Sequence, residues 1–71
     1  MKVIYDQSSE LFFKSFTANG GLLWTKEIKD ALNLWDYRWE QEEQATKRMI
    51  AAWHGKSFSK TGLKVVRSTE L

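Results

Sequence analysis

Apolar residues near the amino end of the chain fall into two short runs separated by a turn-forming tetrapeptide. Residues 11–17 read Leu-Phe-Phe-Lys-Ser-Phe-Thr, residues 22–24 read Leu-Leu-Trp, and residues 18–21 read Ala-Asn-Gly-Gly. Aromatic residues favour strands, and Asn-Gly is a strong hairpin signal because both residues tolerate positive φ. The pattern therefore predicts a β-hairpin, preceded by an early strand.

The longest helical pattern covers residues 36–54 and predicts the main α-helix. Asp36 suits the N-cap, and Gly55 suits the left-handed position that follows a last turn. One broad apolar arc is expected to lie on the sheet, with the opposite side in water. The arc comprises Trp39, Ala45, Met49, Ile50, Ala52 and Trp53, and the wet side comprises Glu40, Gln44, Lys47, Arg48 and Ala51. Within the arc, the stripe expected to fold the chain is Ala45, Met49, Ala52 and Trp53.

Shorter elements flank this helix. Thr25 is expected to cap a single helical turn that closes over the sheet through Ile28 and Leu32. Residues 33–35 are either a short third strand or the link into the main helix. Residues 63–67 are expected to form a closing strand. The chain is therefore expected to be a single α+β domain, residues 1–71, with one helix on one face of a small antiparallel or mixed sheet.

Composition narrows the class of protein. The 71 residues include no cysteine and carry a formal net charge of +2. A disulfide framework and a cysteine-based metal site are therefore excluded. The apolar runs are too short for a signal peptide or a membrane span, so we expect a cytoplasmic protein with no membrane partner.

Catalytic chemistry finds little support in the residues. The single histidine, His54, lies at the predicted helix end, where interaction with the last carbonyl groups is its commoner role. The carboxylates near residues 36–43 are explained by capping and by a solvated helix start, and Gly20-Gly21 lacks the spacing and lysine of a phosphate loop. We expect no enzyme activity, no cofactor and no metal site.

Two surfaces are candidates for binding. The first is the helix entrance, where more aromatic side chains cluster than one face can bury; Trp, Tyr and Arg are also the residues that anchor protein interfaces. Partial exposure of tryptophan in a small domain is the alternative explanation. The candidate residues for protein binding are Trp35, Tyr37, Arg38 and Trp39.

The second surface lies near the carboxyl end and mixes aromatic rings with cations. Rings can stack on bases while lysines neutralise phosphates, which would suit nucleic acid. Alternatively, the rings are core and the lysines keep the protein soluble. The candidate residues for nucleic-acid binding are Trp53, Lys56, Phe58, Lys60, Lys64 and Arg67.

Residues 16–32, the Gln44-Ala45 pair of the helix and residues 62–67 resemble short α+β proteins common in bacteriophages and prophages. These proteins share a strand, a Gly-rich turn, a Trp-Thr … Ala-Leu step, a helix and a terminal Gly-x-x-Val-Val strand. The helix and final strand are also similar, more distantly, to small phage inhibitors of host RNA polymerase. Surplus aromatic and arginine side chains without catalytic groups then favour a monomer or homodimer that modulates a host or defence protein complex by binding it. Nucleic-acid binding is the alternative function.

Overall fold

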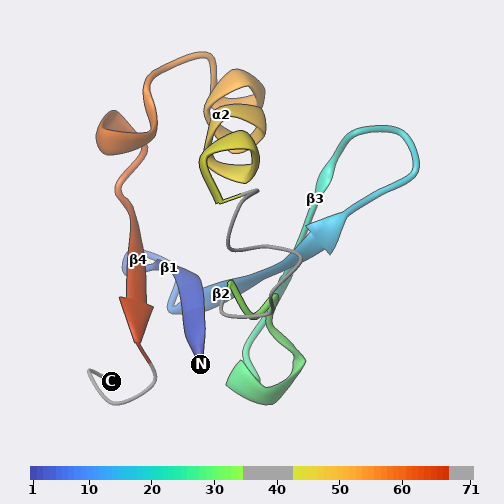
Figure 1. The fold of residues 1–71 in the computed structure, drawn as a ribbon, viewed down its shortest axis with the longest axis vertical. Helices are drawn as coiled ribbons and strands as arrows, with labels where there is room; N and C mark the ends of the chain where they lie inside the picture. Colours follow the sequence, from blue (N-terminus) through green and yellow to red (C-terminus); the bar gives the residue numbers. More distant parts are fainter. Residues whose placement is uncertain (35–42, 68–71) are drawn as a thin grey trace.

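In a computed structural model, the protein consists of a four-stranded antiparallel sheet and one main helix (Figure 1). The structure describes residues 1–34 and 43–67. The α+β class is confirmed, and the sheet is antiparallel rather than mixed, with strand order β3-β2-β1-β4. The expected closing strand pairs with the early strand. The strands are β1 (Lys2–Asp6), β2 (Leu11–Phe16), β3 (Leu22–Thr25) and β4 (Leu63–Arg67), the helix is α2 (Glu43–His54), and η1 (Ile28–Asp30) and η2 (Phe58–Lys60) are short 3-10 helices.

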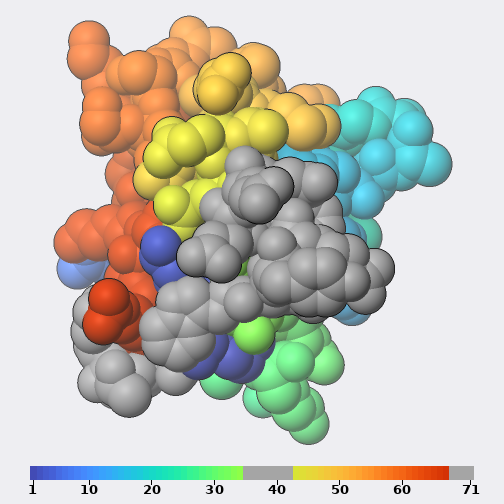
Figure 2. Space-filling model, in the orientation of Figure 1, coloured from blue at the N-terminus to red at the C-terminus, as the bar shows by residue number. Residues whose placement is uncertain are grey.

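The hairpin of β2 and β3 confirms the prediction made from residues 11–24, although the turn works differently from expectation. The Thr17 N–H donates to the Gly21 carbonyl at 2.8 Å, and the Gly20 N–H donates to the Thr17 carbonyl at 3.0 Å. Only Gly20 of the turn has positive φ, +85°, whereas Asn19 does not. This is the pattern of a turn followed by one left-handed glycine rather than the two-residue Asn-Gly turn. The turn projects from the body of the molecule (Figure 2).

A β-bulge in β2 decides which aromatic rings share a face. Phe13 pairs with Trp24 and Ser15 pairs with Leu23, so Lys14 is an extra residue on this strand. Strict alternation would place Phe16 on the face opposite Phe13, but the extra residue returns it to the same face. The two rings meet edge to face with centroids 5.0 Å apart.

The segment after η1 fills a wedge between β1 and β2. These strands pair only at Tyr5 with Phe12 and Asp6 with Leu11, next to the tight turn between them. Farther along, the Leu32 N–H donates to the Phe13 carbonyl at 3.0 Å, and the Leu34 N–H donates to the Lys2 carbonyl at 2.7 Å. Residues 31–34 therefore stand between the two strands and cross from one face of the sheet to the other. Residues 33 and 34, left open as strand or link, are a link.

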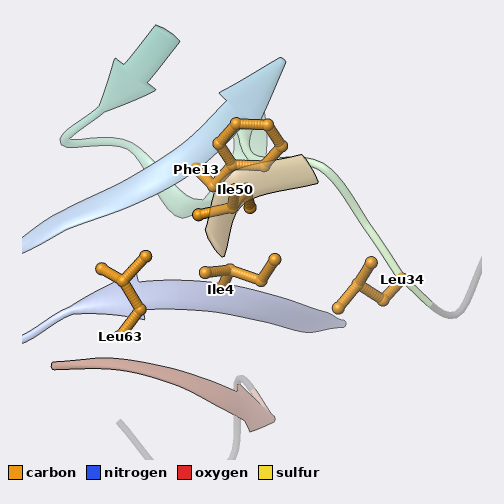
Figure 3. Packing of buried hydrophobic residues seen from close by; sticks show 5 residues of the cluster. All are labelled: Ile4, Phe13, Leu34, Ile50 and Leu63. Carbon is orange, nitrogen blue, oxygen red and sulfur yellow. The ribbon is translucent and has the colours of Figure 1, made fainter. Parts of the chain in front are cut away.

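The main core lies between the sheet and α2 (Figure 3). Ile4, Phe13 and Leu63 project from β1, β2 and β4, and Ile50 of α2 packs on them with no exposed surface. Leu34 closes one end of the cluster. Dense contacts among these five side chains replace contact with water, the main driving force for folding.

The opposite face of the sheet carries a second, smaller apolar cluster. Val3 and Phe12 are buried there together with Ala31, and Ile28 of η1 packs against them. The expected helical turn is thus present as η1, and Ile28 closes over the sheet. Its N-cap is Glu27 rather than the predicted Thr25, whose hydroxyl instead accepts a hydrogen bond from the Glu27 N–H at 3.1 Å. Leu32 packs on the α2 side instead, because residues 31–34 pass through the wedge. Apolar side chains are consequently buried on both faces of this sheet.

The orientation of α2 differs from the predicted stripe. Ile50 is buried as expected, but the buried residue beside it is Thr46 rather than Met49. Met49 and Trp53 are 55 % and 60 % exposed, and Ala45 and Ala52 are exposed as well. These four residues lie on a side of the helix that does not face the sheet. The prediction that Ala45, Met49, Ala52 and Trp53 form the stripe that folds the chain is therefore wrong. Gln44 and Arg48 are exposed as predicted, whereas Lys47 and Ala51 are half-buried.

Two features fix the ends of α2. Lys2 Nζ of β1 forms an ion pair with Glu43 Oε1 at 2.7 Å, which holds the first described turn of the helix to the sheet. At the other end, Gly55 adopts φ +69°, and the N–H groups of Gly55 and Lys56 donate to the carbonyls of Ala52 and Ala51. This pair of backbone hydrogen bonds is the Schellman motif, so the predicted role of Gly55 is confirmed. The predicted N-cap, Asp36, lies outside the described residues.

Candidate functional site

The first candidate surface, at the helix entrance, cannot be placed. Trp35, Tyr37, Arg38 and Trp39 all lie outside the residues that the structure describes. Protein binding through these four side chains therefore stays a prediction.

The second candidate surface is divided by the fold. Phe58 of η2 is half-buried and packs on the main core, which is the structural role weighed against base stacking. Lys64 lies between Leu63 and Val65, which pack on the α2 side, so its side chain points to the opposite face of the sheet. Lys56 and Lys60 are exposed around η2. The structure thus brings Lys56, Phe58 and Lys60 together but separates them from Lys64.

Trp53 is exposed on α2 but lies away from η2. Helix geometry puts residues 44, 47, 48 and 51 on one side, where they line a hollow against η2. Met49 and Trp53 are four residues apart and share the other flank of the helix. Trp53 therefore neighbours Met49 and not Phe58, and the six predicted residues do not form one continuous patch. Arg67 ends β4 and is exposed.

The structure contains a groove between α2 and η2 that was not expected from the sequence. Its volume is about 410 Å³, which is within the range of small-ligand sites. Lys47 and Arg48, assigned only to a solvated helix face, line it, and Lys47 Nζ lies 5.5 Å from the centre of the Phe58 ring. We call it the α2–η2 groove, and its lining residues are Gln44, Lys47, Arg48, Ala51, Ser57, Phe58 and Ser59.

The electrostatic setting of the groove is one-sided. Residues 44–67, from α2 to the end of β4, contain no Asp or Glu. The same stretch contains six basic residues and one histidine: Lys47, Arg48, His54, Lys56, Lys60, Lys64 and Arg67. The acidic residues lie elsewhere in the sequence. Positive and negative charges are therefore distributed much more unevenly along the chain than the net charge of +2 suggests. Lys47, Arg48, Lys56 and Lys60 lie on or around α2 and η2, and a concentration of like charge on one surface attracts anions.

Asp6 has a structural role in the turn after β1. Burial alone would raise the pKa of Asp6, but hydrogen bonds from Ser8 and Ser9 hold that pKa below its ordinary value of 3.8. The Ser8 and Ser9 hydroxyls donate to the two carboxylate oxygens at 2.7 and 2.8 Å, so Asp6 organises the turn between β1 and β2. His54 is exposed in the last turn of α2, the position in which a structural role was expected.

No group of three or more His, Asp or Glu side chains in residues 1–34 and 43–67 is arranged to hold a metal ion. None of the helices described there is long and apolar enough to cross a membrane. Anion binding in the α2–η2 groove is the chemistry that the arrangement of side chains supports.

Comparison of the chain with models of known protein families, with curated protein sequences and with solved structures found no match.

Proposed function

We propose that the protein binds nucleic acid through the basic surface formed by α2, η2 and the loop between them. The observation that carries this proposal is the stretch of residues 44–60, in which four cations, Lys47, Arg48, Lys56 and Lys60, occur without one acidic residue. Lysine and arginine release counterions when they neutralise phosphates, which makes such binding favourable and dependent on salt. Contacts of this kind carry no sequence information by themselves.

Three of these cations supply the centre of the proposed surface. Lys47 and Arg48 line the α2–η2 groove, and Lys60 is exposed on η2 beside it. Lys64 points from the other face of the sheet, so it contributes to the general field rather than to the contact surface. This arrangement predicts that charge at residues 47, 48 and 60 matters more than equal charge elsewhere.

The experiment measures the affinity for a fluorescent single strand of ~20 nucleotides by anisotropy, at salt concentrations from about 50 to 200 mM. We expect the affinity to fall steeply with salt and to fall further in Arg48→Gln and Lys60→Gln. Lys26→Gln and Lys29→Gln are matched controls, because both lysines are exposed and belong to the region around η1. An affinity that does not depend on salt concentration, or that falls equally in all four variants, contradicts the proposal.

Exposed apolar side chains on α2 favour a second candidate function, the binding of a protein. Met49 and Trp53 are both more than half exposed on one flank, and a tryptophan beside a flexible methionine is typical of interface anchors. We infer a phage-encoded protein of the host cytoplasm that occupies a surface of a host or defence protein complex. The flank would act with the helix-entrance residues or in their place.

Capture of a stoichiometric partner from host lysate tests this second candidate. We expect capture to be lost in Trp53→Ala and retained in Leu23→Ala, because Leu23 is also exposed but lies on β3. Recovery of DNA or RNA without a stoichiometric protein refutes it. Sedimentation of the pure protein shows whether the flank instead joins two copies of the chain.

A further inference from the structure

The lining of the α2–η2 groove consists mainly of hydrogen-bond donors. Lys47 and Arg48 project from α2 with full positive charges, and the Gln44 amide and the Ser57 and Ser59 hydroxyls can also donate. None of the seven lining residues is acidic. A ligand that only accepts hydrogen bonds and carries negative charge matches this lining, and a carboxylate or phosphate is such a group.

Two details of geometry favour phosphate over a smaller anion. The Ser57 and Ser59 hydroxyls form a hydrogen bond with each other at 3.4 Å, so their two oxygens lie close enough together to contact one tetrahedral group. Lys47 and Arg48 line the opposite wall, because they belong to α2, whereas Ser57 is the N-cap of η2 and Ser59 lies within η2. A phosphate presents oxygens in several directions at once, and it can therefore be bound from both walls together.

The number of cations indicates which kind of phosphate fits. A phosphodiester within a strand carries one negative charge, whereas a terminal phosphate carries nearly two at neutral pH. Two cations line the groove, and the half-buried Ala51 and Phe58 add apolar surface for the group attached to the phosphate. The remaining lysines lie outside the groove, so no continuous row of cations for successive diesters runs through it.

We propose that the α2–η2 groove binds a terminal phosphate group, carried either by the end of a nucleic-acid strand or by a free nucleotide. For the strand end, the inference rests on the proposed function, since the strand would be held by the surrounding basic surface. For the free nucleotide, the inference does not depend on the proposed function. The groove then selects the end of a strand, a property that the general basic surface lacks.

The experiment compares two single strands of identical sequence, one with a 5′-phosphate and one with a 5′-hydroxyl, together with adenosine monophosphate as the free nucleotide. Affinities for the strands are measured by anisotropy, and adenosine monophosphate is titrated while backbone amide NMR shifts are recorded. The variants are Arg48→Gln and Ser59→Ala in the groove. Lys64→Gln is the control, because it removes the same charge as Arg48→Gln from the other face of the sheet. All three positions are exposed, and circular dichroism verifies the fold.

We expect the 5′-phosphate strand to bind about tenfold more tightly than the 5′-hydroxyl strand, the gain typical of charge-assisted hydrogen bonds. That preference should vanish in Arg48→Gln and shrink in Ser59→Ala, whereas Lys64→Gln should weaken both strands equally. Adenosine monophosphate should shift the amides of residues 47, 48 and 57–59.

Other results separate the groove from the proposed function. Equal affinity for the two strands, with no shift of groove amides, overturns the groove inference and leaves nucleic-acid binding intact. If neither strand binds but adenosine monophosphate still shifts the groove amides, the proposed function fails and the groove holds free nucleotide. If adenosine monophosphate shifts only amides outside the groove, the inference is also overturned.

Discussion

Ile50 and Met49 are adjacent on α2, yet the structure gives them opposite environments, and this contrast yields a sharp test of how the helix sits. Ile50 has no exposed surface and contacts the core between Phe13 and Ile4, whereas Met49 is 55 % exposed. Ile50→Ala removes three methyl or methylene groups, worth about 0.8 kcal/mol each on transfer from water. The cavity left behind adds to this, so we expect a total loss of about 3 to 4 kcal/mol.

A loss of this size is large for the chain. Domains are stable by roughly 0.05 to 0.15 kcal/mol per residue, or about 4 to 10 kcal/mol for a chain of this length. Because Ile50→Ala can approach that limit, Ile50→Val is included, with an expected loss of about 0.5 to 1.5 kcal/mol. Met49→Ala should change the free energy of unfolding by less than about 0.5 kcal/mol, as is usual at exposed positions.

The assay is urea unfolding followed by far-ultraviolet circular dichroism, with the free energy of unfolding extrapolated to water. The slope of free energy against urea should be the same for all variants, so that shifts in midpoint report stability alone. If Met49→Ala destabilises the protein as much as Ile50→Ala, α2 is rotated so that its Met49 flank faces the sheet. The packing argument is then refuted.

Substitutions at three further positions test the turns and the helix end. Gly55→Ala should lower the free energy of unfolding by about 1 kcal/mol in thermal or urea melts, because an alanine at φ +69° is strained; no loss would contradict the Schellman geometry. Glu10→Gly should raise it by about 0.5 to 1 kcal/mol, since Glu10 adopts φ +59°, and Glu10→Ala should not. The pKa of Asp6 is lowered by hydrogen bonds from Ser8 and Ser9, so its carboxylate stabilises the fold above its ordinary value of 3.8, and this contribution disappears as pH falls through the lower folded value. The stability difference between the wild type and Asp6→Ala should therefore be constant at neutral pH and shrink in acid; a difference that grows in acid would refute it.

Elements whose signals are local could be predicted from the sequence. The Asn19-Gly20 pair between apolar runs marked the hairpin, Gly55 marked the end of α2, and the β-branched pair Val65 and Val66 marked β4. Each signal acts through the backbone of a few neighbouring residues, so no distant contact is needed to interpret it. Even here the mechanism of the hairpin turn differed, since one left-handed glycine was enough.

The orientation of α2 could not be derived in the same way. Apolar residues occur at residues 45 and 49–53, which cover well over half of the helix circumference, so periodicity does not single out one face. Contacts from distant parts of the chain decide the face: the ion pair between Lys2 and Glu43, and the space left for Ile50 over the sheet. Burial of Thr46 instead of Met49 follows from those contacts and not from hydrophobicity.

The candidate site shows the same division. The basic character of residues 44–67 is visible in the sequence, but the α2–η2 groove exists only because η2 turns back against the helix. The sequence therefore places Lys47 and Arg48 on an ordinary solvated face, and it groups Lys64 with residues from which the sheet separates it. A cluster of cations in sequence becomes a site only when the chain returns to place hydroxyl groups opposite it.

The wedge filled by residues 31–34 has a consequence for how the sheet opens. Two ribbons, the β2–β3 hairpin and the β1–β4 pair, are joined directly by only two residue pairs, and the rest of the seam is closed by backbone groups of a segment without regular structure. Withdrawal of that segment would expose backbone groups on the facing edges of both ribbons while each keeps its own ladder. The amide hydrogens of Leu32 and Leu34 should thus exchange together with solvent and more slowly than expected for a loop. Their common exchange rate measures how often this segment leaves the seam.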